Sequence, residues 1–143
     1  MILKIFKETQ TPDTFSNDTI KMLFSQLAAT NNYLERYEKS PFWVKSLNEL
    51  LNDCWNENPN LHDLAQVLQL NPITISKHFP KYFGCTLGEY MRRIKIDRSL
   101  SLIQSSAENL TEIALQCGFS DQSHFIRTFK SQTGFLPKQF QKL

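Results

Sequence analysis

The stretch Asn60-Leu-His-Asp-Leu-Ala-Gln-Val-Leu-Gln-Leu-Asn71 returns 49 positions later, counted from 60 to 109, as Asn109-Leu-Thr-Glu-Ile-Ala-Leu-Gln-Cys-Gly-Phe-Ser120. Both copies begin with Asn, carry an acidic residue three positions later (Asp63, Glu112) and repeat apolar residues at helical spacing. An Asn side chain can accept hydrogen bonds from the unpaired N–H groups at a helix start, and the acidic residue can complete a capping box. The stretch therefore predicts a short helix that occurs twice.

A second helix is predicted after each copy. The spacing becomes 50 after one extra residue, counted from 75 to 125, and the match continues through Ile75 and Phe125, Lys77 and Arg127, Phe79 and Phe129, Gly84 and Gly134, and Tyr90 and Phe140. In the second copy Gly118 suits a left-handed turn, and Asp121 can begin the next helix. Gln69 stands at the equivalent position of the first copy, at a cost of roughly 1 kcal/mol if its φ is positive. We therefore expect a slightly different turn there.

Three further helices are predicted outside the repeat. Apolar residues at helical spacing from Leu87 to Ile103 predict a long helix that connects the two copies. A similar pattern from Trp43 to Trp55 predicts a helix that starts after Pro41, and residues 20–34 predict another near the start of the chain. No long alternating pattern typical of a strand occurs, so the predicted fold is all-α, with about seven helices plus the N-terminal one.

Composition excludes several classes of protein. The chain has 143 residues, a net charge of +2 and three cysteines without C-x-x-C pairing or zinc-like spacing to His, so we expect buried thiols and neither a disulfide framework nor a metal site. No nucleophile–base set or phosphate-binding glycine loop can be assembled, which argues against an enzyme and against a cofactor. The opening Met1-Ile-Leu-Lys-Ile-Phe6 is interrupted by charge, so it predicts neither a signal peptide nor a membrane span. These features predict a cytoplasmic protein.

The densest functional signal is Ile113-Ala-Leu-Gln-Cys-Gly-Phe-Ser-Asp-Gln-Ser-His-Phe-Ile-Arg-Thr-Phe-Lys130, followed by Gly134 and Pro137. Together with Pro41-Phe-Trp43 and Glu89-Tyr-Met-Arg-Arg-Ile-Lys95, it resembles the DNA-binding region of the AraC/XylS-type transcription activators. The resemblance implies a bacterial, sequence-specific regulator of transcription with two homeodomain-like helix-turn-helix subdomains. They are expected at about 60–84 and 109–134, joined by a linker helix at about 86–104.

The resemblance also implies roles for individual residues. Each subdomain would place one recognition helix in one of two adjacent major grooves of double-stranded DNA. The base-reading positions are Ile73, Ser76 and Lys77 in the first helix and Gln122, Ser123, Ile126 and Arg127 in the second. Candidates for phosphate contact are Lys81, Thr111, His124 and Lys130.

Alternatives remain open for several of these side chains. Lys77 and Arg127 are also compatible with plain solvated surface, and Arg127 with an ion pair to Asp121 or Asp97. His124 is compatible with packing as well as with phosphate contact. The chain as a whole is also compatible with a protein-interaction module or with non-specific DNA binding, which a basic reading face and sequence-dependent affinity would exclude.

Four residues depart from the family pattern, all in the first unit or the linker: Gln69, Pro80, Lys95 and Ser99. Pro80 removes a backbone N–H late in the first recognition helix, which we expect to be kinked or short. Lys95 stands in place of a usual Arg and Ser99 in place of a usual Ala. The second unit should therefore match the family more closely.

The expected domain organisation is an N-terminal helical appendage or linker remnant at 1–40 and an AraC-type DNA-binding domain at 41–143. Residues 1–40 would dock on the core or mediate self-association. Most members of the family carry a sensor or dimerisation domain ahead of the DNA-binding part, so the chain is expected to be either a naturally short regulator or a fragment. The partners implied are promoter DNA, RNA polymerase and, through residues 1–40 or a missing N-terminal domain, a second copy.

Overall fold

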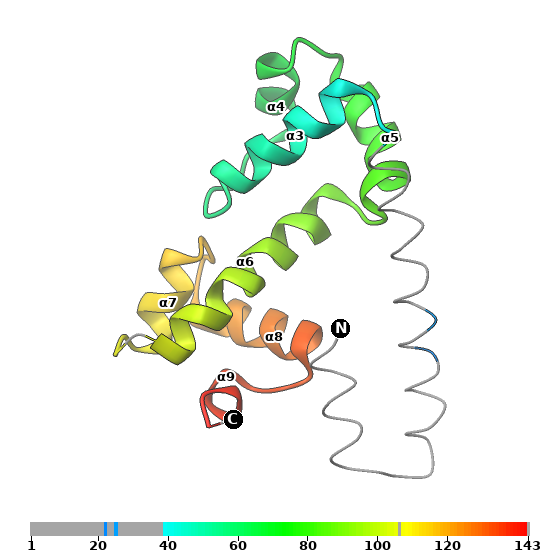
Figure 1. Ribbon diagram of the computed structural model, residues 1–143. Helices are drawn as coiled ribbons and strands as arrows, with labels where there is room; N and C mark the ends of the chain where they lie inside the picture. The colour runs from blue at the N-terminus through cyan, green and yellow to red at the C-terminus, as the bar shows by residue number, and fades with distance from the viewer. Residues whose placement is uncertain (1–21, 23–24, 26–38, 106, 143) are drawn as a thin grey trace.

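The computed structural model describes Met22, Ser25, 39–105 and 107–142 (Figure 1). Within these residues the chain forms α-helices and no strand: α3 (Phe42–Asp53), α4 (Leu61–Val67), α5 (Pro72–Phe83), α6 (Leu87–Ser105), α7 (Leu110–Gln116), α8 (Gln122–Thr133) and α9 (Pro137–Phe140). The predicted all-α fold with two helix-turn-helix units and a long linker helix is confirmed. The helix predicted at 20–34 lies outside the described residues, except for Met22 and Ser25.

The long helix α6 separates two cores. In Figure 1 it crosses the molecule, with α3, α4 and α5 on one side and α8 and α9 on the other. The first core is formed by buried residues of α3 to α6: Leu47, Leu51, Leu64, Ala65, Ile75, Phe79, Met91 and Ile94. The second is formed by α6 to α9: Ile96, Ile103, Ile113, Ala114, Cys117, Phe119, Phe125, Phe129, Phe135 and Phe140. Each helix-turn-helix unit thus buries its apolar face against its own half of α6.

Asparagine caps start the first helix of each unit, as predicted. The Asn60 Oδ1 accepts from the backbone N–H groups of His62 and Asp63, at 2.9 and 3.0 Å. Asn109 does the same for Thr111 and Glu112, both at 3.0 Å. Glu112 completes the capping box by accepting from the N–H of Asn109 at 2.9 Å.

The prediction of a capping box in the first unit is wrong in detail. Asp63 accepts from the side-chain amide of Asn60 at 2.6 Å, rather than from its backbone N–H. An aspartate is one methylene shorter than the glutamate of the second unit, so its carboxylate pairs with the cap side chain instead. The first unit therefore has only half of the reciprocal arrangement that the second has.

The turn inside the first unit is the same as in the second, which corrects the expectation of a different turn. Gln69 has φ +54° and Gly118 has φ +69°. The following N–H groups also bond alike: Leu70 donates to Ala65 at 2.9 Å, and Phe119 donates to Ala114 at 3.0 Å. The packing of the unit thus imposes the left-handed conformation even on a residue with a side chain.

Pro80 does not shorten the first recognition helix, which corrects a second expectation. α5 and α8 have 12 residues each. Each ends at a glycine in the left-handed region, Gly84 with φ 70° and Gly134 with φ 84°. The carbonyl of Pro80 accepts from the N–H of Gly84 at 3.0 Å, so the last turn closes normally although Pro80 itself donates nothing.

The repeat extends beyond the helix-turn-helix units. At the start of α6, Glu89 accepts from the backbone N–H of Thr86 at 2.9 Å, and that bond holds the pKa of the Glu89 carboxyl below its usual range. At the start of α9, Gln139 accepts from the N–H of Leu136 at 3.0 Å. The short α9 therefore corresponds to the first turn of α6 and covers the second core with Phe140.

The three cysteines are free thiols. Cys85 and Cys117 are buried as predicted, whereas Cys54 is half-buried and donates to the carbonyl of Leu50 at 2.9 Å. Burial raises the pKa of Cys117 to about 11. Among the described residues no group of His, Cys, Asp and Glu side chains is placed to hold a metal ion. No described helix combines the length and the apolar character that crossing a bilayer requires.

Candidate nucleic-acid interface

The first recognition helix, α5, presents the three predicted residues to solvent. Asn71 caps the helix by accepting from the N–H of Ile73 at 2.9 Å. Ile75 and Phe79 anchor one side of the helix in the first core. Ile73, Ser76 and Lys77, at spacings of three and four, are all exposed. Ile73 is 71% exposed, which suits contact with a thymine methyl group.

The second recognition helix, α8, presents its predicted residues less uniformly. Ser123 and Arg127 are exposed, whereas Gln122 and Ile126 are half-buried. Ile126 packs against the second core. The Gln122 Oε1 accepts a hydrogen bond from the hydroxyl of Thr111 at 3.3 Å. The structure thus brings a predicted base-reading residue and a predicted phosphate-contacting residue together at the N-terminal ends of α8 and α7.

Arg127 has no carboxylate partner among the described residues. The carboxylate of Asp121, which was one alternative ion-pair partner of Arg127, has another role. Asp121 caps α8 by accepting from the N–H of His124 at 2.7 Å, and that bond holds the pKa of Asp121 below its usual range. The guanidinium of Arg127 is therefore available to a ligand.

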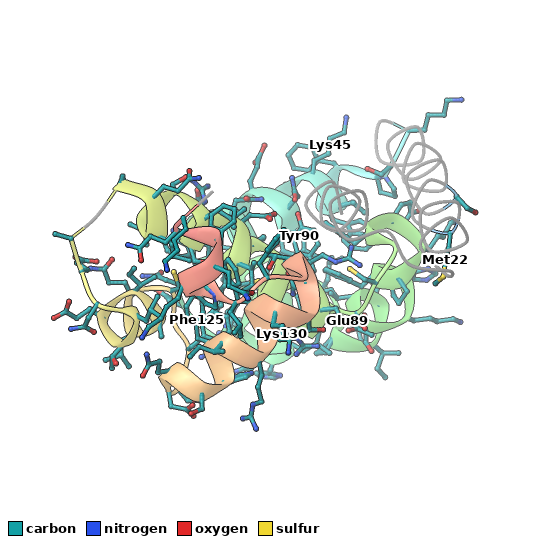
Figure 2. The ribbon with its side chains drawn as sticks, turned by 90° about the horizontal axis from the view of Figure 1, so that it is seen from below. Met22, Lys45, Glu89, Tyr90, Phe125 and Lys130 are labelled. Atoms are coloured by element: carbon teal, nitrogen blue, oxygen red, sulfur yellow. The ribbon has the colours of Figure 1, made fainter. Side chains whose placement is uncertain are left out.

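The phosphate candidates fall into three environments. Lys81 and Lys130 are exposed in the last turns of α5 and α8, away from the N-caps. The Lys81 Nζ lies 5.1 Å from the ring centroid of Tyr82. Thr111 is exposed at the start of α7. His124 is half-buried and packs edge-on against Phe119, with ring centroids 5.3 Å apart. Figure 2 labels Phe125 and Lys130 on α8 and, from the start of α6, Glu89 and Tyr90.

Two residues near this surface were missed as functional candidates. The sequence marks Lys95 only as a departure from the family pattern and gives no sign of a role for Asn58. The Lys95 Nζ donates to the Asn58 Oδ1 at 2.7 Å and to the carbonyl of Gly118 at 2.8 Å. One signal was present in the sequence, since Lys95 follows Met91 at helical spacing within an apolar stripe.

A family model described as a helix-turn-helix domain matches residues 64–143, more than half of the chain. The chain is 27% identical over 150 aligned positions to the HTH-type transcriptional activator RhaR of Salmonella arizonae, covering 100% of the chain and 53% of that protein. The chain belongs to the AraC family of DNA-binding transcription regulators. It spans about half the length of the curated relatives that it matches.

Solved structures of bacterial regulators have the same fold. A transcriptional regulator from Chromobacterium violaceum with an AraC-type DNA-binding domain aligns with a TM-score of 0.66 at 21% identity, over 70% of this chain and 89% of that one. The C-terminal domain of the response regulator yesN from Fusobacterium nucleatum aligns with a TM-score of 0.62 at 26% identity, over 68% and 95%. The family that the sequence matches is one of DNA-binding transcription regulators and not of enzymes.

Proposed function

We propose that this AraC-type chain binds one duplex in a sequence-specific manner, with α5 and α8 in two adjacent major grooves. The observation that carries the proposal is the equivalence of Lys77 and Arg127 in the repeat. Both side chains are exposed on their recognition helices. The apolar residues two positions before and two positions after each of them are buried. Two such helices engage successive grooves when they are held about 34 Å apart. The 19 residues of α6, at 1.5 Å each or about 28 Å, suit that separation.

Chemistry suggests a task for each base-reading residue. Arg127 and Lys77 can donate to guanine O6 and N7, and Gln122 can pair with adenine. Ile73 and Ile126 suit thymine methyl groups, and Ser76 and Ser123 accept or donate to either kind of base. Lys81, Lys130, Thr111 and His124 would contact phosphates, with His124 the least accessible of the four.

The same proposal covers the organisation of the whole chain. Residues 41–143 would form the DNA-binding domain, and residues 1–40 an appendage or linker remnant. Promoter DNA and RNA polymerase would be the partners, with self-association through residues 1–40 or a preceding domain, and the site of action would be the cytoplasm. Support comes from the curated relatives, which are named transcriptional activators and are about twice as long as this chain.

Selection from random duplexes with the purified chain tests the proposal. We expect a bipartite motif with half-site centres about 10 base pairs apart, one for each recognition helix. Arg127→Ala should cost about 1–3 kcal/mol at the selected site and remove the preference at one position of one half-site. Lys77→Ala should do the same in the other half-site.

The matched control is Lys45→Ala, which removes an exposed cation from α3, outside both helix-turn-helix units. This variant should select the wild-type motif. Absence of any enriched motif would contradict sequence-specific reading, and a motif with one half-site only would contradict the use of both helices.

A further inference from the structure

A lysine is buried where the two helix-turn-helix units meet. Lys95 is 3% exposed and lies on α6 between Ile94 of the first core and Ile96 of the second. Burial lowers the pKa of its ammonium group. A buried ammonium is costly unless its N–H groups are hydrogen-bonded, and an apolar side chain would fill the same space at a lower cost. The lysine therefore needs an explanation beyond packing.

The two acceptors of Lys95 come from different units. Asn58 lies in the loop that leads into α4, the first helix of the first unit, and its Oδ1 accepts from the Nζ at 2.7 Å. Gly118 lies in the turn between α7 and α8, so it belongs to the second, and its carbonyl accepts at 2.8 Å. One ammonium group thus joins the two units through directional bonds.

The backbones of the two units are also in close contact at this junction. A methyl group on Gly118 would place its carbon 1.8 Å from the carbonyl oxygen of Asn56, so the turn of the second unit lies directly against the loop of the first. Trp55, in that loop, packs against both cores. The carbonyl that Lys95 holds is four residues before Gln122, the first residue of α8. Any shift at this junction would therefore turn α8 relative to α5.

We propose that Lys95 is a positioning residue that locks the Asn58 loop to the Gly118 turn, fixes the relative orientation of α5 and α8, and so selects the spacing of the two DNA half-sites. This inference rests on the proposed function, because it requires both recognition helices to bind one duplex. Linked binding modules gain the most when the link is stiff and matches the span between the two sites, and they lose that gain when the geometry is wrong. The lock makes the link stiff.

Two variants test the lock. Lys95→Met keeps the length and apolar stem of the side chain but removes the ammonium. Asn58→Ala removes one acceptor at an exposed loop position, takes no side chain out of either core, and leaves Lys95 its bond to the Gly118 carbonyl. Lys45→Met, the same change at an exposed position of α3, is the matched control. Circular dichroism establishes that each chain is folded, and Asn58→Ala alone decides the outcome if Lys95→Met does not fold.

The measurement is affinity for the selected bipartite site and for versions with one or two base pairs inserted or deleted between the half-sites. For the wild type and Lys45→Met we expect affinity to fall about tenfold or more for a change of one base pair, because each base pair rotates and shifts one half-site relative to the other. For Lys95→Met and Asn58→Ala we expect the fall to be threefold or less, by the same reasoning about linker stiffness. Affinity for an isolated half-site should not change.

The outcomes separate the two proposals. A sharp spacing optimum in the wild type that survives in both variants overturns the lock and leaves the proposed function intact. A wild type that is indifferent to spacing overturns the engagement of two grooves, and the lock with it. A uniform loss of affinity at every spacing and at the isolated half-site would assign Lys95 to folding alone and also overturns the lock.

Discussion

Gln69 shows, at the scale of one residue, what the helix-turn-helix unit demands of its turn. Its φ of +54° is in the region that glycine occupies in the second unit. That conformation costs an L-residue about 1–2 kcal/mol, while glycine loses about 0.5–1 kcal/mol more chain entropy on folding. We expect Gln69→Gly to raise the free energy of unfolding by up to about 1 kcal/mol, measured by urea denaturation.

The control for this change is Gln66→Gly, an exposed position inside α4, where glycine should lower the free energy of unfolding by about 1 kcal/mol. Equal destabilisation by both variants would mean that the turn gains nothing from glycine. DNA affinity should follow stability only, because neither residue is among the proposed contacts.

Lys130 belongs to the same scale, since its proposed role is that of a single charge. A residue that neutralises one phosphate releases counterions, so Lys130→Ala should weaken binding to all duplexes and reduce the salt slope of log K by about one unit. The slope is measured by titration at several salt concentrations. An unchanged slope, as expected for Lys45→Ala, would contradict the phosphate role.

The sequence predicted which single side chains are exposed, but it did not predict contacts between side chains that are far apart in the chain. Exposure of Ile73, Lys77 and Arg127 follows from helical periodicity, because their neighbours at core spacing are apolar. The contacts of Lys95 with Asn58 and Gly118 join positions far apart in the chain. No periodicity encodes such a pair, so its existence depends on the fold.

Capping shows how the two units differ at the scale of the element. Glu112 completes the box at the start of α7, whereas Asp63 does not at the start of α4. Asp63→Glu should complete the missing bond and raise the free energy of unfolding by about 0.3–1 kcal/mol. The reciprocal change, Glu112→Asp, should lower it by a similar amount.

Thermal and urea unfolding of both variants checks this pair of changes. Each one alters a side chain by a single methylene and keeps its charge, so the pair controls for electrostatics. Stabilisation or destabilisation by both would contradict the capping explanation.

Most elements followed from local signals in the sequence. Asn caps, terminal glycines and apolar spacing predicted α4, α5, α7 and α8, and Pro41 predicted the start of α3. Two expectations failed because tertiary packing overrode local chemistry: Pro80 lies within a full-length α5, and Gln69 adopts a glycine conformation. α9 was not predicted, since a four-residue helix has too little periodicity to detect and follows only from the repeat.

At the scale of the whole molecule, α6 and Trp55 make two similar units into one body. The buried residues of α6 change partner along the helix, with Met91 and Ile94 in the first core and Ile96 and Ile103 in the second. Trp55 packs against both cores and lies 6.0 Å from the Arg98 guanidinium. The sequence predicted the connecting helix but not this junction. Trp55 fits the apolar spacing predicted for the helix from Trp43 to Trp55, and that spacing does not reveal its contact with the second core.

Removing Trp55 should therefore separate the unfolding of the two units. Trp43 is the matched control, since it is also half-buried but packs only against the first core. Each Trp→Ala change should lower stability by on the order of 2 kcal/mol, below the range for a fully buried tryptophan. In Trp43→Ala, hydrogen exchange of the core amides of α5 and α8 should accelerate together, because the units remain coupled.

With Trp55→Ala as the background, the added Trp43→Ala change should accelerate exchange in α5 and leave α8 nearly unchanged. The loss of the effect on α8 measures the coupling through Trp55, as in a double-mutant cycle. If Trp43→Ala affects α5 alone in the otherwise wild-type chain, the two units are already independent. In that case α6 joins them without making them cooperative, and the stiffness that two-groove binding requires has to arise when the DNA binds.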